Sequence, residues 1–141
     1  GKENLGGLID ALVANDEPSG GVKPSPPFSE ASASDGRRLL GAKGMGCVSC
    51  HGVKGAPALA TPGIDLALMH ERLRPDWFRR FLTNPAALKP GTRMPVFWPD
   101  GVSPIKDVAG GDMSRQINAL WDCLSQGEKM PFPEGMNTQD R

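Results

Sequence analysis

Apolar residues recur at helical spacing in several stretches of the chain, and segments rich in Gly, Pro and polar residues separate them. The pattern over residues 5–14 predicts a short amphipathic helix with Leu8 and Leu12 on one side. Residues 15–33 are rich in Pro, Ser, Gly and Glu, a composition that predicts a linker. Residues 1–33 are therefore expected to be a helix and a linker that precede a compact domain.

The compact domain is expected to cover residues 34–127, followed by a C-terminal tail over residues 128–141. No stretch of the domain alternates apolar and polar residues as a strand does, so we predict an all-α fold with long loops. A long irregular stretch is expected over residues 85–111. About four short helices are expected in the domain: from a cap at Ser34 or Asp35 to Lys43, from a cap at Asp65 to Leu73, from Pro75 to Asn84, and over residues 112–126.

The composition indicates that side chains alone do not fill the core of such a domain. Apolar residues make up 38% of the 141 residues, while 18 Gly and 14 Pro favour loops, so a bound group would help to form the core. The 16 basic and 16 acidic residues balance, which argues against a nucleic-acid-binding protein. The sequence has no apolar run long enough for a transmembrane helix.

The strongest chemical signal is Cys47-Val48-Ser49-Cys50-His51. The spacing of Cys47 and Cys50 lets both thiols reach the same edge of a porphyrin and add across its vinyl groups, and His51 then lies under the iron. We therefore expect one covalently attached haem c with His51 as an iron ligand.

Two other chemistries use a Cys-x-x-Cys pair. A thioredoxin-like redox site is expected within a βαβ pattern, which this sequence lacks. A zinc site needs four ligands, and only His70 and Cys123 remain to complete one, at no recognised spacing. Cys123 is expected to be a buried thiol in the last helix, although an exposed thiol could form an intermolecular disulfide.

A second iron ligand is expected from one of six methionines. Met69 lies on an apolar helical stripe and is expected in the core. Met94 stands in Pro90-Gly91-Thr92-Arg93-Met94-Pro95, where Pro and Gly restrict the loop and lower the ordering entropy that opposes a weak bond. A thioether ligand favours ferrous iron and suits electron transfer. The alternatives are a buried Met94 beside a five-coordinate iron, and ligation by His70, whose place on a helix favours a surface or half-buried side chain instead.

The order of these features resembles a class I bacterial cytochrome c: a helix, Cys-x-x-Cys-His, a Gly-rich loop, two short helices, Pro-Gly-Thr-x-Met-Pro and a last helix. The segments Arg74-Pro75-Asp76-Trp77, Asn84-Pro85 and Gln116-Ile117-Asn118-Ala119-Leu120-Trp121 resemble cytochrome domains of large modular bacterial proteins. The resemblance implies a cytochrome c fold wrapped around one haem, with Met94 as the distal ligand.

The resemblance also implies that a backbone carbonyl accepts the Nδ1–H of the proximal His, which orients the ring. Here Ile64 follows Gly63 where that family often has Pro, so the carbonyl is expected from Pro62 or Ile64. Trp77 is a candidate donor to a haem propionate and Arg93 a candidate counter-charge. Packing of Trp77 against Phe81 is the alternative explanation of its spacing.

Basic residues are concentrated in one part of the sequence, and this has two explanations. They form either a solvated helix surface or a docking face for an acidic redox partner. The members of this basic cluster are Arg72, Arg74, Arg79, Arg80, Lys89 and Arg93.

The sequence thus predicts a non-enzymatic electron-transfer protein, either a carrier or the electron-entry module of a larger oxidoreductase, with a redox protein or a neighbouring domain as its partner. Haem attachment to this motif takes place outside the bacterial cytoplasm, so we expect a periplasmic or otherwise exported protein whose longer gene product carries the export signal. The alternatives are a haem enzyme or gas sensor with an open sixth coordination position, and a thiol-redox or zinc module.

Overall fold

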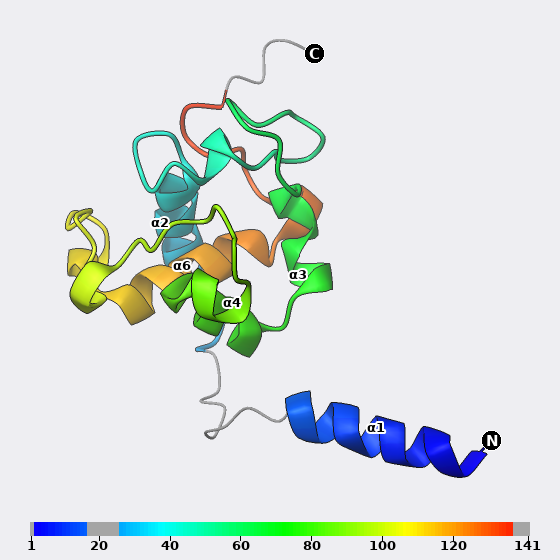
Figure 1. Cartoon of the computed structure of the whole chain (residues 1–141). Helices are drawn as coiled ribbons and strands as arrows, with labels where there is room; N and C mark the ends of the chain where they lie inside the picture. The colour runs from blue at the N-terminus through cyan, green and yellow to red at the C-terminus, as the bar shows by residue number, and fades with distance from the viewer. Residues whose placement is uncertain (1, 17–25, 137–141) are drawn as a thin grey trace.

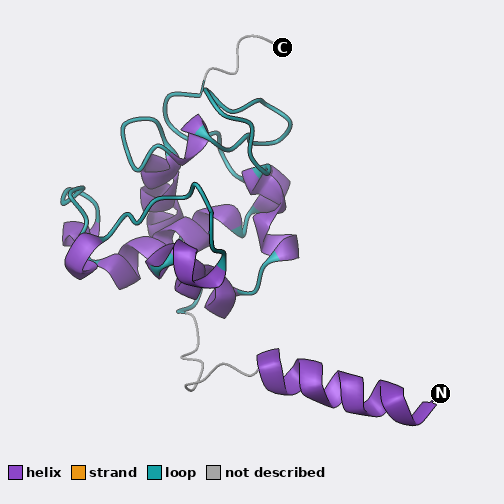
Figure 2. Ribbon diagram, in the orientation of Figure 1, coloured by secondary structure: helices purple, strands orange, loops and turns teal. Residues whose placement is uncertain are grey.

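Helices and loops make up the protein in the computed structural model, which describes residues 2–16 and 26–136. Figure 2 draws helices and loops only, and the described ranges contain no strand beyond two isolated bridges, Val53 with Ala56 and Val102 with Asp112. The chain is thus predominantly helical, as the all-α class predicts. In chain order the elements are α1 (Lys2–Asp16), α2 (Glu30–Leu40), η1 (Cys47–Ser49), η2 (Leu66–Leu68), α3 (Met69–Arg72), α4 (Pro75–Thr83), α5 (Pro85–Leu88), η3 (Pro99–Gly101), η4 (Ala109–Gly111), α6 (Met113–Leu124) and η5 (Gly127–Lys129).

The main helix–helix contact is between α2 and α6, which cross in the centre of Figure 1. A Cβ on Gly36 would lie 2.0 Å from the carbonyl oxygen of Ala119 and 2.8 Å from the Cβ of Cys123. The two backbones therefore meet at a position that only Gly can occupy. The residues that surround this crossing are apolar and buried, and they include Leu39, Leu40, Ile117, Leu120 and Leu124.

The first helix of the domain begins earlier than its sequence pattern predicts. α2 starts at Glu30, because the side chain of Ser29 accepts the backbone N–H of Ser32, and it ends at Leu40 rather than at Lys43. The expected linker therefore loses its last residues to α2, and its central residues 17–25 lie outside the described part of the chain.

The short helices that follow have the predicted caps. The Asp65 carboxylate accepts the N–H of Ala67 at the start of η2, which continues into α3. Pro75 occupies the first turn of α4. Asn84 ends α4, and its side chain also caps α5 by accepting the N–H of Ala87. The stretch 85–111 is therefore less irregular than predicted, since it contains α5, η3 and η4.

The segment expected as a C-terminal tail packs onto the helical body as far as residue 136. Met130 is fully buried. The Arg37 side chain donates from Nε to the carbonyl of Phe132 at 2.7 Å, and the N–H of Ala42 donates to the carbonyl of Glu134 at 2.9 Å. These contacts with α2 and with Ala42, which follows it, join residues 128–136 to the domain. Residues 137–141 lie outside the described range.

The predicted N-terminal helix is present as α1, which lies apart from the other helices in Figure 1. Its apolar residues Leu5, Leu8, Ile9 and Leu12 are each at least half exposed. Within the described ranges, no helix combines the length and the apolar character that crossing a membrane requires.

Candidate functional site

The Cys-x-x-Cys-His motif forms a single tight turn, which residues 41–46 separate from the end of α2. Cys47 begins η1, and its carbonyl accepts the N–H of Cys50 at 3.1 Å and the N–H of His51 at 2.9 Å. The turn brings both cysteines and the histidine onto one short segment. Val48, the residue between them that points into the core, is fully buried and anchors this turn.

His51 is held by a backbone carbonyl on the following loop. Its Nδ1 lies 2.7 Å from the carbonyl oxygen of Ile64. A carbonyl only accepts hydrogen bonds, so Nδ1 carries a proton, and in the neutral ring Nε2 keeps its lone pair. Of the two carbonyls expected from sequence, Pro62 and Ile64, the structure selects Ile64.

Gly63 permits this contact. A Cβ on Gly63 would lie 2.2 Å from the carbonyl oxygen of Cys50 and 3.2 Å from Nδ1 of His51. No other residue type allows the loop to approach the motif so closely. This requirement is visible only in three dimensions, because Gly63 is one of many glycines in the sequence.

Asp65 fixes the loop from the other side of Ile64. Its carboxylate accepts three backbone N–H groups, those of Lys54 at 3.0 Å, Gly55 at 2.7 Å and Ala67 at 2.8 Å. Sequence reasoning identified Asp65 only as a helix cap. In the structure it also joins the turn after the motif to η2, and it thereby sets the position of the Ile64 carbonyl.

The two motif cysteines are free thiols in different surroundings. Cys47 is half-buried and Cys50 is exposed. Burial raises the pKa of the Cys47 thiol to about 12, and repulsion from Cys50 adds to the rise. A thiol-disulfide exchange site has the opposite property, since its attacking cysteine has a lowered pKa.

Met94 lies on a loop with a regular turn. The N–H of Thr92 donates to the carbonyl of Lys89 at 3.1 Å, which closes a turn with Pro90 and Gly91 at its centre, and Gly91 has a φ of +79°. The Thr92 hydroxyl oxygen then accepts the N–H of Met94 at 3.2 Å. The restricted loop predicted from Pro90 and Gly91 is therefore present.

Several apolar side chains pack against the core while staying partly exposed. Met94 is one of them, together with residues of the motif segment, of the α3–α4 connection and of the Met94 loop. A bound apolar group would favourably bury the exposed part of any of these side chains that it contacts. The set includes Met45, Cys47, Leu73, Met94 and Phe97.

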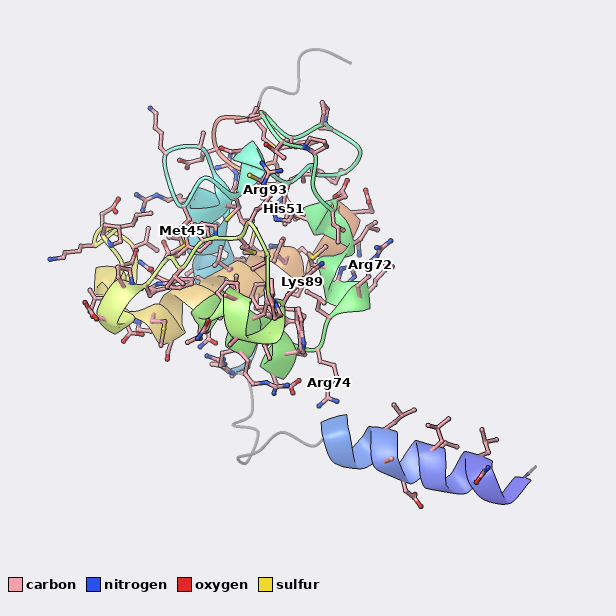
Figure 3. All side chains as sticks on the ribbon, in the orientation of Figure 1. Met45, His51, Arg72, Arg74, Lys89 and Arg93 are labelled. Carbon is pink, nitrogen blue, oxygen red and sulfur yellow. The ribbon has the colours of Figure 1, made fainter. Side chains whose placement is uncertain are left out.

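The other two predicted site residues, Trp77 and Arg93, have different surroundings. Trp77 stacks on Phe81 with ring centroids 4.8 Å apart, as the packing explanation predicts. It lines a surface pocket of about 220 Å³ with Arg72, Arg74 and Arg80. Arg93 is exposed on the Met94 loop, and in Figure 3 it projects onto the same upper part of the body as His51, whereas Arg72 and Arg74 lie toward α3 and the start of α4.

Some residues of the basic cluster contact other side chains, and others are exposed without an ion-pair partner among the described residues. Arg79 donates to the side chain of Asn118 and joins α4 to α6. Arg74 forms an ion pair with Asp76 at 3.2 Å. Arg72 and Arg80 are exposed, and neither forms an ion pair with another described residue.

Three further sequence expectations have structural outcomes. Met69 is buried in the core, as predicted. Cys123 is fully buried in α6, which confirms its expected role as a small apolar residue. His70 is half-buried, and its Nδ1 lies 3.1 Å from the carbonyl of Ala67 in its own helical segment.

Among the described residues, no three His, Cys, Asp or Glu side chains come together in an arrangement that could hold a metal ion. The donors at the motif are instead two free thiols and one imidazole whose Nε2 lone pair is available. That donor set fits a haem, which takes two thioether bonds and one axial nitrogen from the protein.

Comparison with protein families, with curated proteins and with solved structures finds no match to this chain.

Proposed function

We propose that this chain is a c-type cytochrome module, with a cytochrome c fold, that transfers single electrons through one covalently held haem c. Cys47 and Cys50 form the thioether bonds, His51 is the proximal iron ligand and Met94 the distal one. The observation that carries the proposal is the contact between His51 Nδ1 and the Ile64 carbonyl beside two free thiols, because it leaves Nε2 unprotonated for the iron.

The bound haem supplies the one-electron exchange between ferric and ferrous iron. The residues of the chain hold it and keep its geometry constant. Ile64 and Asp65 fix the imidazole of His51, which increases its donor strength. The turn at residues 89–92 restricts the loop of Met94, so little ordering entropy opposes a weak thioether bond.

The high pKa of Cys47 favours this function over thiol-disulfide exchange. A thiol-disulfide exchange site needs a stabilised thiolate, and burial of Cys47 disfavours its thiolate. The partner in electron transfer is proposed to be a redox protein or a neighbouring domain of a longer chain, and the module is proposed to act in the periplasm or another exported location.

The test is export-directed expression together with haem-maturation machinery, followed by an optical spectrum of the reduced protein. We expect the narrow bands of a low-spin haem c, and colour that stays with the polypeptide after denaturation. Cys47→Ala and Cys50→Ala should each weaken covalent attachment, while Cys123→Ala, which removes the one cysteine outside the motif, should leave it intact. His51→Ala should lose the low-spin spectrum, and His70→Ala should keep it.

Two results would contradict the proposal. A colourless protein obtained from cells that mature a control cytochrome would favour the thiol or zinc alternatives. A coloured protein whose reduced form binds carbon monoxide rapidly and stoichiometrically would favour the enzyme or gas-sensor alternative with an open sixth position.

A further inference from the structure

Gln116 is a fully buried polar residue at the fourth position of α6, and every polar atom of its side chain has a partner. Its Nε2 donates to the carbonyls of Ile105 and Val108, each at 2.8 Å. Its Oε1 accepts the indole N–H of Trp98 at 2.7 Å. Because an amide has two N–H donors, both are used here.

All three partners of Gln116 belong to one segment, residues 98–108, which Figure 1 draws in yellow beside the start of α6. A buried amide is unfavourable unless it is hydrogen-bonded, so an apolar residue would fill this space at less cost. The amide does what an apolar residue cannot do: it fixes three points of an irregular segment relative to a helix.

The segment held by Gln116 begins four residues after Met94. Trp98 is buried, with 4% of its surface exposed, and Phe97 packs edge-on against it with ring centroids 5.9 Å apart. Four residues span at most about 14 Å, and Pro95 removes further freedom. Met94 is therefore held between the turn at residues 89–92 on one side and the Trp98 anchor on the other.

We propose that Gln116 is a positioning residue for the distal ligand. By joining Trp98 and the Ile105–Val108 segment to α6, it raises the fraction of molecules in which the Met94 loop is in place to bind iron. This inference rests on the proposed function. Without Gln116, a buried indole N–H and two carbonyls lose their partners, which shifts the equilibrium toward a released loop roughly ten- to hundredfold.

The experiment measures how easily added imidazole displaces Met94 in the ferric holoprotein at pH 7. Gln116→Leu should bind imidazole roughly ten- to hundredfold more tightly than the unmodified protein, because the apparent affinity follows the population of the open state. Trp98→Phe removes the indole donor and part of the buried ring, but it leaves both bonds from Gln116 Nε2 to backbone carbonyls, so it should give a smaller increase. The effect of the double variant should be smaller than the sum of the two single effects, because Gln116→Leu has already broken the bond between the Trp98 indole and Gln116.

The matched control is Leu124→Ala. Leu124 is buried in the same helix, two turns from Gln116, so its truncation lowers the denaturation midpoint without touching the residue 98–108 segment. It should bind imidazole with unmodified affinity. A lower denaturation midpoint in Gln116→Leu with unchanged imidazole affinity would show that Gln116 only stabilises the fold.

Failure of this inference and failure of the proposed function give different results. If the unmodified ferric protein lacks the weak methionine–iron band at about 695 nm, Met94 is not the ligand and both proposals fall. If that band is present and neither Gln116→Leu nor Trp98→Phe changes the imidazole affinity, only the positioning role is overturned. If Gln116→Leu does not fold, the imidazole affinity of Trp98→Phe tests the positioning role.

Discussion

Nδ1 of His51 lies 2.7 Å from the carbonyl oxygen of Ile64, thirteen residues along the chain. The contact depends on two neighbours with different roles: Gly63 lets the loop approach, and Asp65 keeps it in place through three backbone N–H groups. The orientation of the imidazole is therefore set by the whole loop after the motif, and changes in that loop should alter the haem site without removing any ligand.

Gly63→Ala tests this dependence. The added Cβ would lie 2.2 Å from the Cys50 carbonyl, so the loop must move away and the bond from His51 to Ile64 is lost. We expect lower haem incorporation, and a loss of stability of about 1–3 kcal/mol, typical of overpacking. Gly7→Ala in α1, where an added Cβ meets no atom within 4 Å, is the control and should change neither quantity. Equal haem content in the two variants would contradict the role of Gly63.

Gly36→Ala should be more damaging, because the clash is between two backbones. The new Cβ would lie 2.0 Å from the Ala119 carbonyl oxygen, and neither α2 nor α6 can move away without opening the core. We expect a loss of at least about 3 kcal/mol, beyond the usual range for an added methyl group. Urea denaturation followed by circular dichroism measures it, with Gly6→Ala as the exposed control. A variant that unfolds at the unmodified midpoint would show that the helices are not in such close contact.

Met94→Ala should abolish the ferric band at about 695 nm and lower the reduction potential, because the thioether that favours ferrous iron is gone. Reduced Met94→Ala should also bind carbon monoxide readily. Met113→Ala removes another half-buried methionine, at the first position of α6, and should leave band and potential unchanged. A band that survives in Met94→Ala would exclude Met94 as the ligand.

The buried thiol of Cys123 should make the folded protein less stable at high pH. Burial raises the pKa of this thiol to about 11, although the positive charge of Arg37 opposes the rise. In the unfolded chain a thiol has a pKa of about 8.5, so between these values the folded state binds the proton more tightly. Its contribution is complete below pH 8.5 and is lost as pH rises through about 11, by at most about 1.4 kcal/mol per pH unit. Unfolding measured across that range should be less pH-dependent in Cys123→Ala. An identical profile in both proteins would exclude this thiol as the cause.

The exposed arginines Arg72 and Arg80 test the docking explanation of the basic cluster. If an acidic redox partner binds there, Arg72→Glu with Arg80→Glu should slow electron transfer to that partner severalfold at low ionic strength, and the difference should shrink as added salt screens the charges. Stopped-flow mixing at several salt concentrations measures both effects. Each single variant is compared with Arg115→Glu, at an exposed position of α6, which changes the net charge by the same amount. Equal rates for all variants would favour the solvated-surface explanation.

The sequence by itself determined the local features of this protein. The spacing of Cys47, Cys50 and His51, the cap at Asp65, Pro75 in the first turn of α4, the end of α4 at Asn84, and the apolar stripes of α4 and α6 are all short-range patterns, and each has the predicted place in the structure. The start of α2 was less predictable, because several of residues 29–35 are suitable caps and the packing of α2 on α6 decides among them.

Only the tertiary structure decided the long-range relationships. Nothing in the sequence distinguishes Gly36 and Gly63 from the other glycines, because their importance depends on which backbone lies against them. Gln116 likewise reads as one polar residue in an amphipathic helix, until its three partners from residues 98–108 are seen. Residues 128–136 lack a helical pattern and suggested a free tail, yet the carbonyls of Phe132 and Glu134 accept bonds from Arg37 in α2 and from Ala42 just after it. In each case the deciding contact joins residues far apart in the chain, and the local periodicity of a sequence carries no record of such contacts.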